Sequence, residues 1–476
     1  MIPKKKPIVF LLLIITSVIL RFYSFFPAVM DHDESTYLII GRDLAQGKQM
    51  YTDVMDTKPV GIFLIYSFFH YIFGYSIFLT RLFVAVMIGA TAHLIYLASI
   101  KLINEKSPAF AAAIIYLFYT SIWTKFGVGP NAELFFNLTT ISGFFFFLKH
   151  KKWSYSAAGL LFGIGFMIKY LVLFDFIFLS AFFLIRELSL NKWRIGKTSF
   201  LKYVFAGIGF SIPFLATNLY FYLGSNFEAF KYITYELPSK YGQGHNNMKY
   251  LLFLLDFLVR FLPISIMLFY ALFSKVKMLK KWQLQMFLFW IVGILIAMYL
   301  PGKNFGHYSI QLMIPLSLIT GLYFHPNLNK GRVLQLITGK KYGIYFLLAS
   351  FLIVQISGIS SKIMNNDKPR QVAEYLNKNK KSDETLYLSN YKHIVYYLLR
   401  TDSPTKYVHP TLLSNPSHAK AIGIDGKQEI RNIIENNPTW VVMYDFNNYV
   451  KELIKNDYNI DTVFSESKVE IYKISD

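Results

Sequence analysis

The sequence predicts a polytopic α-helical membrane protein with about eleven transmembrane helices, followed by a small C-terminal α/β domain. Hydrophobic residues make up 54% of the 476 residues and charged residues only 16%, which leaves too little polar surface for a water-soluble protein. Apolar runs recur along the chain with short clusters of Lys and Arg between them, as in multi-pass membrane proteins. From about Asn365 the composition becomes that of a soluble domain of ordinary size.

The first apolar run, "MIPKKKPIVFLLLIITSVIL", has the charged start and the apolar core of a signal peptide. Arg21 and several aromatic residues follow it, where a cleavable signal peptide needs small residues. We therefore expect an uncleaved first transmembrane helix. The chain contains no cysteine, so disulfides, thiolate metal sites and cysteine nucleophiles are excluded.

The predicted spans follow the apolar runs in order, and two of them are short. They lie near residues 8–28, 82–100, 108–122, 131–148, 154–168, 170–185, 203–222, 258–273, 284–300, 308–324 and 342–360. A further run at residues 60–78 is as hydrophobic as several of these, so hydropathy alone would count it as another span.

The distribution of Lys and Arg argues against a span at residues 60–78. Without it, the short loops on the side of the N-terminal lysines hold 21 basic residues, against 10 on the other side. With it, every later loop would change sides and the basic loops would lie outside, against the positive-inside rule. We therefore predict that residues 60–78 lie along or dip into the outer leaflet. The N-terminus is then cytoplasmic and the C-terminal domain extracytoplasmic.

This threading gives two domains: a transmembrane domain at residues 1–364, with its first outer loop at 29–81, and a soluble extracytoplasmic α/β domain at 365–476. In the second domain, "RQVAEYLNKNKK" and "KQEIRNIIENN" predict helices, because apolar residues recur at helical spacing. Strands are predicted at "ETLYLSN", "TWVVMYD" and "KVEIYKIS". We find no internal repeat and no Gly-rich phosphate loop.

The formal net charge of +21 raises the question of a nucleic-acid partner. The basic residues come in short clusters between apolar runs and not on one soluble face, which is the pattern of cytoplasmic loops. We therefore expect no nucleic acid among the partners.

An acidic cluster, "MDHDESTYLIIGRDL", follows the first span directly. Asp31 and Glu34 have capping-box spacing, so one interpretation is only a well-capped juxtamembrane helix. That interpretation leaves Asp33 without a structural role. The functional interpretation is that Asp33 is a general base at the membrane surface with Glu34 beside it, since low-dielectric surroundings and a second acid raise a carboxyl pKa toward the value a base needs.

A hard-cation site formed by Asp31, His32, Asp33 and Glu34 is a third interpretation of the cluster. Adjacent residues of a helix point in different directions, so these four alone cannot close a coordination shell. A divalent metal stays possible only with ligands from elsewhere, and the sequence does not indicate one.

Further polar residues fall on the predicted outer side. Singly, each has a structural explanation: Lys58 and Lys169 can snorkel, Arg81 can anchor a helix end, and His307 can be an interfacial aromatic. Together, these cations and potential cations are harder to explain by structure alone, because positive charge buried in a membrane needs an anionic partner. A lipid-linked phosphate would be such a partner. The candidate binding residues are Lys58, Arg81, Asn131, Glu133, Lys169, Lys303, His307 and Tyr308.

These segments resemble a known family. Asp33-Glu34 after the first span, "RDLAQGKQMYTDVMDTKPVGIFLIY", "GPNAELFF" and "HYSIQLMIPL" are similar to the bacterial protein mannosyltransferase and aminoarabinose transferase group, that is, glycosyltransferase family 39 and its relatives. The resemblance covers the whole membrane part, and the Asp-Glu pair with a later Lys-Pro is its most specific piece. Where relatives often have two prolines after the lysine, this chain has "KPV", which affects a helix start more than the chemistry.

The resemblance implies a GT-C fold in a bacterial inner (plasma) membrane. It also implies an inverting glycosyltransferase that takes a sugar from a polyprenyl phosphate on the outer face, with Asp33 as base and cations stabilising the leaving phosphate. The expected partners are this lipid-linked donor, membrane lipids and an unidentified acceptor, and no cofactor is required. The alternative is a transporter or flippase of lipid-linked or anionic substrates, although it would usually show repeat symmetry. A receptor or scaffold has no use for Asp33.

Overall fold

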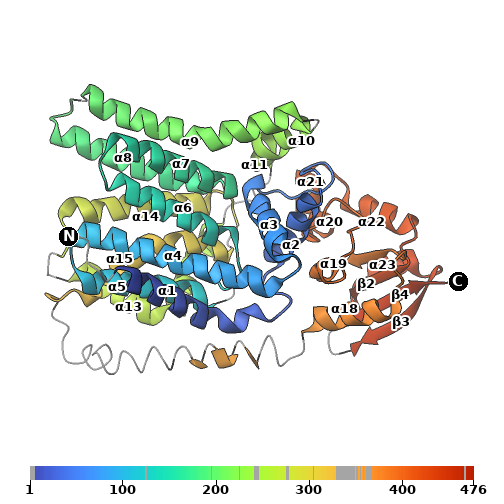
Figure 1. Cartoon of the computed structure of the whole chain (residues 1–476). Helices are drawn as coiled ribbons and strands as arrows, with labels where there is room; N and C mark the ends of the chain where they lie inside the picture. Colours follow the sequence, from blue (N-terminus) through green and yellow to red (C-terminus); the bar gives the residue numbers. More distant parts are fainter. Residues whose placement is uncertain are drawn as a thin grey trace. The chain divides into compact units, whose positions relative to one another are not determined.

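The computed structural model describes residues 6–475 apart from 124–125, 195, 225, 241–245, 275–277, 304, 466–467 and most of 329–366. These residues form two compact units. Unit 1 comprises Met1–Phe25, Phe78–Tyr220 and Gly242–Ser360, and unit 2 comprises Phe26–Ile77, Phe221–Tyr241 and Ser361–Asp476. Figure 1 labels most of the helices and strands of both units. The domain boundary predicted near residue 365 falls outside the described residues and stays a prediction.

Unit 1 is helical, and most predicted spans coincide with its helices. The elements are α1 (Lys6–Arg21), η1 (Phe22–Phe25), α4 (Ile77–Ile103), α5 (Lys106–Ile122), α6 (Ala132–Phe147), α7 (Lys152–Ile168), α8 (Val172–Leu190), α9 (Lys197–Leu223), α12 (Asn247–Arg260), α13 (Leu262–Phe273), α14 (Lys281–Tyr299), η4 (Gly306–Leu312), α15 (Met313–Thr320) and η5 (Gly321–Phe324). The span predicted at residues 342–360 lies mostly outside the described residues.

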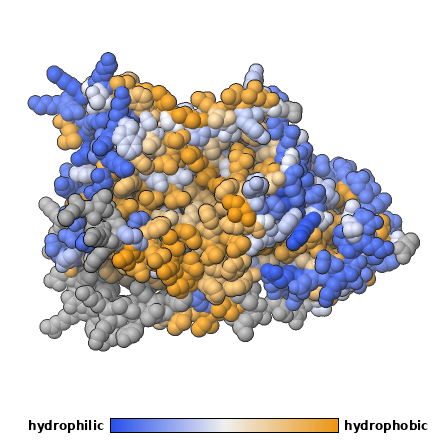
Figure 2. All heavy atoms as spheres, viewed as in Figure 1, coloured by the Kyte–Doolittle hydropathy of each residue, from blue (hydrophilic) through white to orange (hydrophobic). Residues whose placement is uncertain are grey.

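Four helices of the described residues are long and apolar enough to cross a membrane: Pro7–Phe25, α4, α9 and α14. α12 and α13 would add a fifth span if the bent pair is counted as one. The surface in Figure 2 is apolar over much of this helical unit. The predicted fold class, a polytopic helical membrane protein with a small C-terminal sheet domain, is confirmed, and the chain is a multi-pass membrane protein.

Two predicted spans have a different internal structure from the one expected. The helix predicted at residues 258–273 is broken at Phe261, where α12 and α13 meet at an angle of 97°. Pro263 lies in the first turn of α13, and a proline favours a helix start there because its missing N–H needs no partner. The run predicted at 308–324 combines two 3-10 segments, η4 and η5, with the short helix α15 between them.

Glycine residues allow α7 and α9 to pack backbone to backbone. A Cβ at Gly159 would lie 2.0 Å from the carbonyl oxygen of Ala206, and one at Gly163 would lie 2.3 Å from that of Phe210. On the facing helix, a Cβ at Gly209 would lie 2.3 Å from the carbonyl oxygen of Ser156. Small residues are the usual means of close helix packing in membranes, where apolar side chains gain little from leaving the lipid.

Unit 2 begins with two packed helices, α2 (His32–Ala45) and α3 (Val60–Phe73). α3 occupies most of the run at residues 60–78 whose crossing we predicted against. Its 14 residues span roughly 21 Å, and an apolar core of about 30 Å needs a longer helix. Three short segments precede the gap at 241–245: α10 (Phe227–Lys231), the π-helical turn η3 (Tyr232–Glu236) and α11 (Leu237–Lys240).

The C-terminal part of unit 2 contains a four-stranded sheet in the order β1-β2-β4-β3. β1 (Leu386–Ser389) and β2 (Trp440–Tyr444) are parallel, while β4 (Val469–Ile474) is antiparallel to both β2 and β3 (Tyr458–Phe464). Helices α18 (Lys368–Asn379), α19 (Ile394–Leu398), α20 (Thr411–Ser414), α21 (Pro416–Ala421), α22 (Gly426–Glu435) and α23 (Asn448–Ile454) complete it.

The sequence predicted two helices and three strands of this domain, and all five are confirmed as α18, α22, β1, β2 and β4. It did not predict β3. This edge strand contains Asn459 and Asp461, which are unfavourable in strands, and its register shifts between Ile460 and Thr462. The pairing of β3 with β4 therefore outweighs the weak strand propensity of its own sequence.

A candidate active site around Asp33

The first turn of α2 fixes the position of Asp33. Asp31 is the N-cap residue, and its side chain accepts a hydrogen bond of 2.8 Å from the backbone N–H of Asp33. The capping role predicted for Asp31 is therefore confirmed. Glu34 follows in the same turn and is buried, with 1% of its surface exposed. Two acidic residues in the first turn also suit the positive end of the helix dipole.

Close packing on α3 holds this turn in place. A Cβ at Gly41 would lie 2.6 Å from the carbonyl carbon of Tyr66, so only glycine allows the two helices to approach so closely. Tyr37, one turn after Asp33, is buried between α2 and α3 and meets the rings of Phe63 and Tyr66 at centroid distances of 5.7 and 5.3 Å. Sequence patterns did not predict that α3 packs against the helix that carries Asp33.

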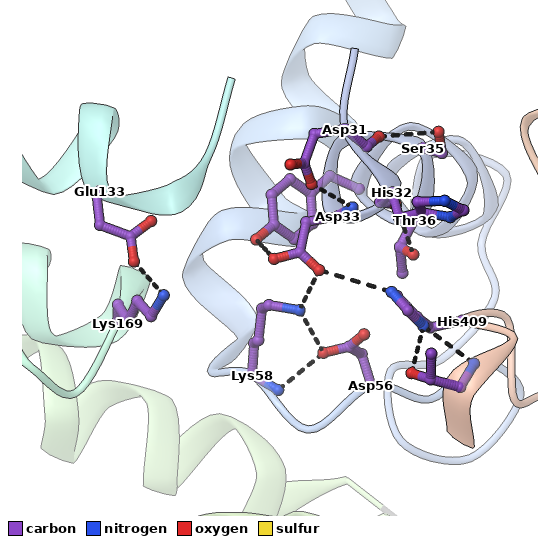
Figure 3. A network of polar contacts seen from close by, with 12 residues as sticks. Asp31, His32, Asp33, Ser35, Thr36, Asp56, Lys58, Glu133, Lys169 and His409 are labelled. Carbon is purple, nitrogen blue, oxygen red and sulfur yellow. Dashed lines mark hydrogen bonds and ion pairs between the residues drawn. The ribbon is translucent and has the colours of Figure 1, made fainter. Parts of the chain in front are cut away.

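Three side chains surround the carboxylate of Asp33 (Figure 3). The Nζ of Lys58 lies 3.2 Å from Oδ1, and the Nε2 of His409 lies 3.7 Å from the same oxygen. The hydroxyl of Tyr37 reaches Oδ2 at 3.5 Å. The side chains of Asp33 and Lys58 are each 17% exposed, so the carboxylate is shielded but not sealed from solvent.

The loop between α2 and α3 places Lys58. The carboxylate of Asp56, with only 2% of its side chain exposed, accepts from the backbone N–H of Lys58 at 3.0 Å and from its Nζ at 3.4 Å. Tyr51 donates a hydrogen bond of 3.0 Å to the Lys58 carbonyl. The ammonium also lies 5.4 Å from the centroid of the Tyr37 ring. Lys58 is therefore held between two carboxylates and does not snorkel freely.

His409 comes from the C-terminal part of unit 2 and belongs to a group of three histidines. Its Nδ1 lies 2.8 Å from the hydroxyl of Thr411. Its ring lies 5.5 Å from that of His393 and 6.4 Å from that of His32. His393 contacts α2 directly, with Nε2 2.8 Å from the hydroxyl of Thr36. Sequence reasoning missed His393, His409 and Asp56, because no local motif marks residues that only the fold brings to Asp33.

Burial shifts the pKa values of several groups in this cluster. The pKa of Asp31 rises to about 7 because of burial and of the neighbouring Asp33. Burial lowers the pKa of His409 below its usual value, and it lowers the pKa of His393 much further, with the charges of His409 and His32 adding to the effect. Both histidines are therefore neutral at pH 7.

A second polar group lies in unit 1, at the ends of α6 and α7. The Nζ of Lys169, the C-cap residue of α7, forms an ion pair with Oε1 of Glu133 in the first turn of α6. The same ammonium lies 4.5 Å from the centroid of the Tyr308 ring on η4. Glu133 is fully buried, and the side chain of Lys169 is 12% exposed. Three of the predicted residues, from distant parts of the sequence, therefore meet.

Asn131 and Arg81 occupy buried positions in the same unit. Asn131 is the N-cap residue of α6 and is 1% exposed, and neither side-chain polar atom has a hydrogen-bond partner among the described residues. Arg81 lies inside α4, which begins earlier than the predicted span, and its Nη1 donates a 2.8 Å hydrogen bond to the Ser24 carbonyl. The helix-anchoring explanation for Arg81 thus has a direct structural basis.

The remaining predicted residues lie around η4. The ring of His307 is 5.4 Å from that of Phe305 and 4.9 Å from that of Tyr308. Lys303 is 6% exposed, with its ammonium 5.8 Å from the centroid of the Phe305 ring. The sequence did not indicate Asp175, a fully buried residue whose carboxylate accepts from Trp290 at 2.6 Å and from Gln311 at 2.5 Å.

Among the residues that the structure describes, no group of three or more His, Cys, Asp or Glu side chains is arranged to hold a metal ion. The chemistry that the Asp33 cluster can perform is proton transfer. One carboxylate lies against a lysine and a histidine in a partly desolvated site, and a carboxylate positioned in this way can accept a proton from a bound hydroxyl.

The sequence of residues 57–221 matches the family model described as dolichyl-phosphate-mannose-protein mannosyltransferase. The curated proteins contain no sequence that matches this chain.

Solved structures match more of the chain. ArnT from Cupriavidus metallidurans bound to undecaprenyl phosphate is 12% identical with a TM-score of 0.65, and the match covers 99% of this chain and 98% of that one. The structure of the same protein in the apo state has 12% sequence identity and a TM-score of 0.65, and the match covers 97% of each chain. The oligosaccharyltransferase AglB from Archaeoglobus fulgidus, in complex with an inhibitory peptide and a dolichol-phosphate, is 10% identical with a TM-score of 0.54, covering 94% of this chain and 70% of that one.

The family match confirms the resemblance to protein mannosyltransferases that the sequence indicated, over residues 57–221. The fold is that of ArnT over nearly the full length of both chains, including the C-terminal domain. The family match begins one residue before Lys58 and ends two residues before the end of α9, so it spans Arg81, Glu133 and Lys169 but not Asp33.

Proposed function

We propose that this protein transfers a sugar from a polyprenyl-phosphate donor to a hydroxyl group of a lipid, glycan or protein acceptor, at the extracytoplasmic face of a bacterial inner membrane. The observation that carries the proposal is the carboxylate of Asp33, held at the start of α2 by Lys58 and His409. The ArnT fold supports it, since that protein was solved with undecaprenyl phosphate bound. The dolichol-phosphate in the AglB complex is a lipid phosphate of the same class.

In the proposed reaction, Asp33 accepts the proton of the acceptor hydroxyl while its oxygen attacks the anomeric carbon of the donor sugar. A bond forms between that oxygen and the anomeric carbon as the bond from the carbon to the phosphate oxygen breaks. The polyprenyl phosphate leaves with the electron pair. Attack from the side opposite the phosphate inverts the anomeric configuration. Glu34, in the same turn, is the nearest alternative base in the sequence.

Lys58 and His409 are positioning residues in this scheme. Both contact Oδ1 of Asp33, so they fix the orientation of the carboxylate. Asp56 holds Lys58 from the other side. A base fixed by neighbouring side chains loses less entropy when the reaction geometry is reached.

The donor phosphate needs cationic or hydrogen-bonding groups as it leaves. Lys169 is the leading candidate in unit 1, because its ammonium is partly exposed, and Glu133 and Tyr308 orient it. Asn131, with both polar atoms unsatisfied among the described residues, is suited to hydrogen-bond a ligand. Arg81, Lys303 and His307 complete the proposed donor-binding set. We propose no metal or cofactor.

The proposed orientation has a cytoplasmic N-terminus and an extracytoplasmic C-terminal domain. The support is the excess of Lys and Arg in the loops that this threading places in the cytoplasm. Because Asp33, Lys58 and His409 all belong to unit 2, the same orientation would put the whole cluster outside the cytoplasm.

The proposal is tested with the purified full chain in lipid nanodiscs. An undecaprenyl-phosphate hexose with a labelled sugar is added together with lipid and glycan extracts of a bacterial envelope. We expect labelled acceptor and free undecaprenyl phosphate, no transfer from a nucleotide sugar, and unchanged transfer in EDTA. Movement of intact donor between leaflets without bond cleavage would favour the flippase instead, and transfer from the nucleotide sugar would overturn the proposal.

A further inference from the structure

The C-terminal part of unit 2 contains a cavity of about 710 Å³, to which the roles assigned above give no ligand. It lies where the parallel strands β1 and β2 end: Ser389 and Asn390 line it from the end of β1, and Asn447 and Tyr449 line it from the segment after β2. In open sheets with parallel strands, ligands bind at the carboxyl ends of those strands. Most other lining residues belong to the long connection from β1 to β2.

The lining has the chemistry of a carbohydrate site. Tyr387, Tyr396 and Tyr407 are buried, and Tyr449 is half-buried. Such rings offer flat apolar surfaces with hydroxyl groups at their edges. Amides and hydroxyls alternate with them: Asn390, Asn447, Ser389, Ser403, Thr405 and Ser414 also line the cavity. A pocket with aromatic walls and several neutral hydrogen-bonding groups suits a ligand that has both apolar faces and many hydroxyls.

The charges favour an anionic ligand. Two exposed lysines, Lys420 and Lys427, contribute to the lining, and Asp425 is the one acidic residue among them. The carboxylate of Asp425 already accepts from the backbone N–H groups of Lys427 and Gln428 as the cap of α22. The two ammonium groups are therefore the main charges available to a bound molecule.

His393 links this cavity to Asp33. It lines the cavity and is 1% exposed, and its Nδ1 has no hydrogen-bond partner among the described residues. Its Nε2 contacts Thr36, one turn after Asp33 on α2, at 2.8 Å. His409, 5.5 Å away ring to ring, contacts Asp33 itself. A buried histidine nitrogen without a partner at the cavity wall is the second observation that points to a ligand.

We propose that this cavity binds a sugar with an anionic substituent, and that this sugar is part of the acceptor. The tyrosines hold the ring, the amides and hydroxyls hold its hydroxyl groups, and Lys420 and Lys427 hold the anionic group. The assignment of this sugar to the acceptor rests on the proposed function, because it requires that Asp33, on the α2 side of His393, is the base. The binding of the sugar to the cavity does not depend on the proposed function.

Saturation-transfer NMR with the full chain in nanodiscs tests binding directly. The probes are glucose 6-phosphate, glucose and inorganic phosphate. We expect glucose 6-phosphate to receive saturation, and the double variant Lys420→Gln/Lys427→Gln to weaken its binding by about tenfold or more, since hydrogen bonds to charged groups contribute on this scale. Lys378→Gln, an exposed lysine of α18 outside the cavity, is the matched control and should change nothing.

A second variant addresses the aromatic wall. Tyr449→Ala should weaken both glucose 6-phosphate and glucose, whereas the lysine variant should affect only the phosphorylated sugar. Complete displacement of glucose 6-phosphate by an equal concentration of inorganic phosphate would show an anion site and overturn the carbohydrate assignment. Unchanged binding in both variants would overturn the cavity as the site.

The acceptor assignment is separated from the proposed function by Asp33→Asn. This variant should keep saturation transfer to glucose 6-phosphate even though it loses glycosyl transfer. In the active protein, Lys420→Gln/Lys427→Gln should raise the acceptor KM. If the lysine variant weakens sugar binding but leaves the acceptor KM unchanged, the cavity binds a sugar that is not the acceptor and the assignment is overturned, with the proposed function intact.

Discussion

The Nε2 of His409 lies 3.7 Å from Oδ1 of Asp33, although the two residues come from opposite ends of the chain. Asp33 is in the first turn of α2, and His409 is in the connection between β1 and β2. Both belong to unit 2, so the C-terminal segment is part of the candidate site and not an appendage to it. This relationship makes the C-terminal domain relevant to the proposed proton transfer.

Replacing His409 should slow transfer without abolishing it. The ring contacts the same carboxylate oxygen as Lys58, so His409→Ala removes one of the two groups that orient the base. We expect kcat to fall about tenfold, below the effect of removing a general base itself, and the donor KM to stay unchanged. His418→Ala, in the same domain but outside the cluster, is the control. An unchanged kcat in folded His409→Ala protein would remove the C-terminal domain from the proton-transfer step.

The pH dependence of stability should differ in sign between two residues of the cluster. His393 has a pKa lowered by burial, so the unfolded chain binds its proton first and stability is lost as the pH falls below 6.5, the ordinary histidine value. Asp31 has a pKa raised from 3.8 to about 7, so the folded chain binds its proton first and stability is gained as the pH falls from 7 toward 4. The two contributions therefore oppose each other between about pH 6.5 and pH 4.

Melting temperatures in nanodiscs at pH 7.5 and pH 5.5 measure both contributions. Compared with the unmodified chain, His393→Gln should lose less stability on acidification, and Asp31→Asn should lose more. Asparagine caps helices as well as aspartate, so the second variant keeps the start of α2. Shifts in the same direction for both variants would contradict the burial of these groups in the folded chain.

Donor binding should depend on the cations of unit 1. Arg81→Ala and Lys169→Ala are expected to weaken binding of a polyprenyl-phosphate sugar much more than His307→Ala does, because Arg offers a fork and Lys a full charge, whereas neutral His offers one hydrogen bond. Acceptor binding should change little.

Lys169 and Arg81 both make structural contacts, so their variants need matched controls. Lys169→Ala leaves Glu133 buried without its ion-pair partner, so Lys169→Met/Glu133→Gln separates loss of the cation from an uncompensated buried charge. Arg81 donates a hydrogen bond to the Ser24 carbonyl, so Arg81→Ala can also lower stability. Its donor affinity is therefore compared with that of the unmodified chain at an equal concentration of folded protein. Donor affinity unchanged in both the Arg81 and the Lys169 variants would assign the two residues to structure alone.

The topology is tested by reporter fusions. A reporter after Asp476 and one after Lys101 should lie on opposite sides of the membrane, the first outside and the second in the cytoplasm. This follows from the uneven distribution of Lys and Arg and from the prediction that the 14-residue helix α3 does not cross. Reporters on the same side would show that the threading is wrong.

Much of the fold could be predicted from local sequence patterns. Helices such as α6 and α7 coincide with apolar runs to within two residues, because a membrane span needs a continuous apolar stretch. The bend between α12 and α13 at Phe261 was not predicted, because hydropathy carries no information about the direction of a helix axis. β3 was missed because an edge strand with polar residues is stabilised by its neighbour and not by its own composition.

The candidate site likewise contains residues that could be predicted from the sequence and residues that only the fold reveals. Asp33 stands out because an acidic cluster directly follows the first apolar run, and Lys58 stands out because it is a basic residue on the predicted outer side, which has fewer of them. Glu133, Lys169 and Tyr308 were proposed as members of one set of binding residues, and only the packing of α6, α7 and η4 shows that they touch. His409 had no local signal, because its role depends on a contact across the sequence with Asp33.

The most direct test of the account is glycosyl transfer by Asp33→Asn in nanodiscs, with labelled undecaprenyl-phosphate hexose as donor. The asparagine keeps the shape of the side chain but cannot accept the acceptor proton, while Asp383→Asn, an exposed aspartate of the same unit, serves as control. The account predicts a loss on the order of 10²-fold or more, with membrane abundance and melting temperature near normal and the control fully active. Retained transfer by folded Asp33→Asn would contradict the assignment of Asp33 as the base and shift attention to Glu34 or Glu133.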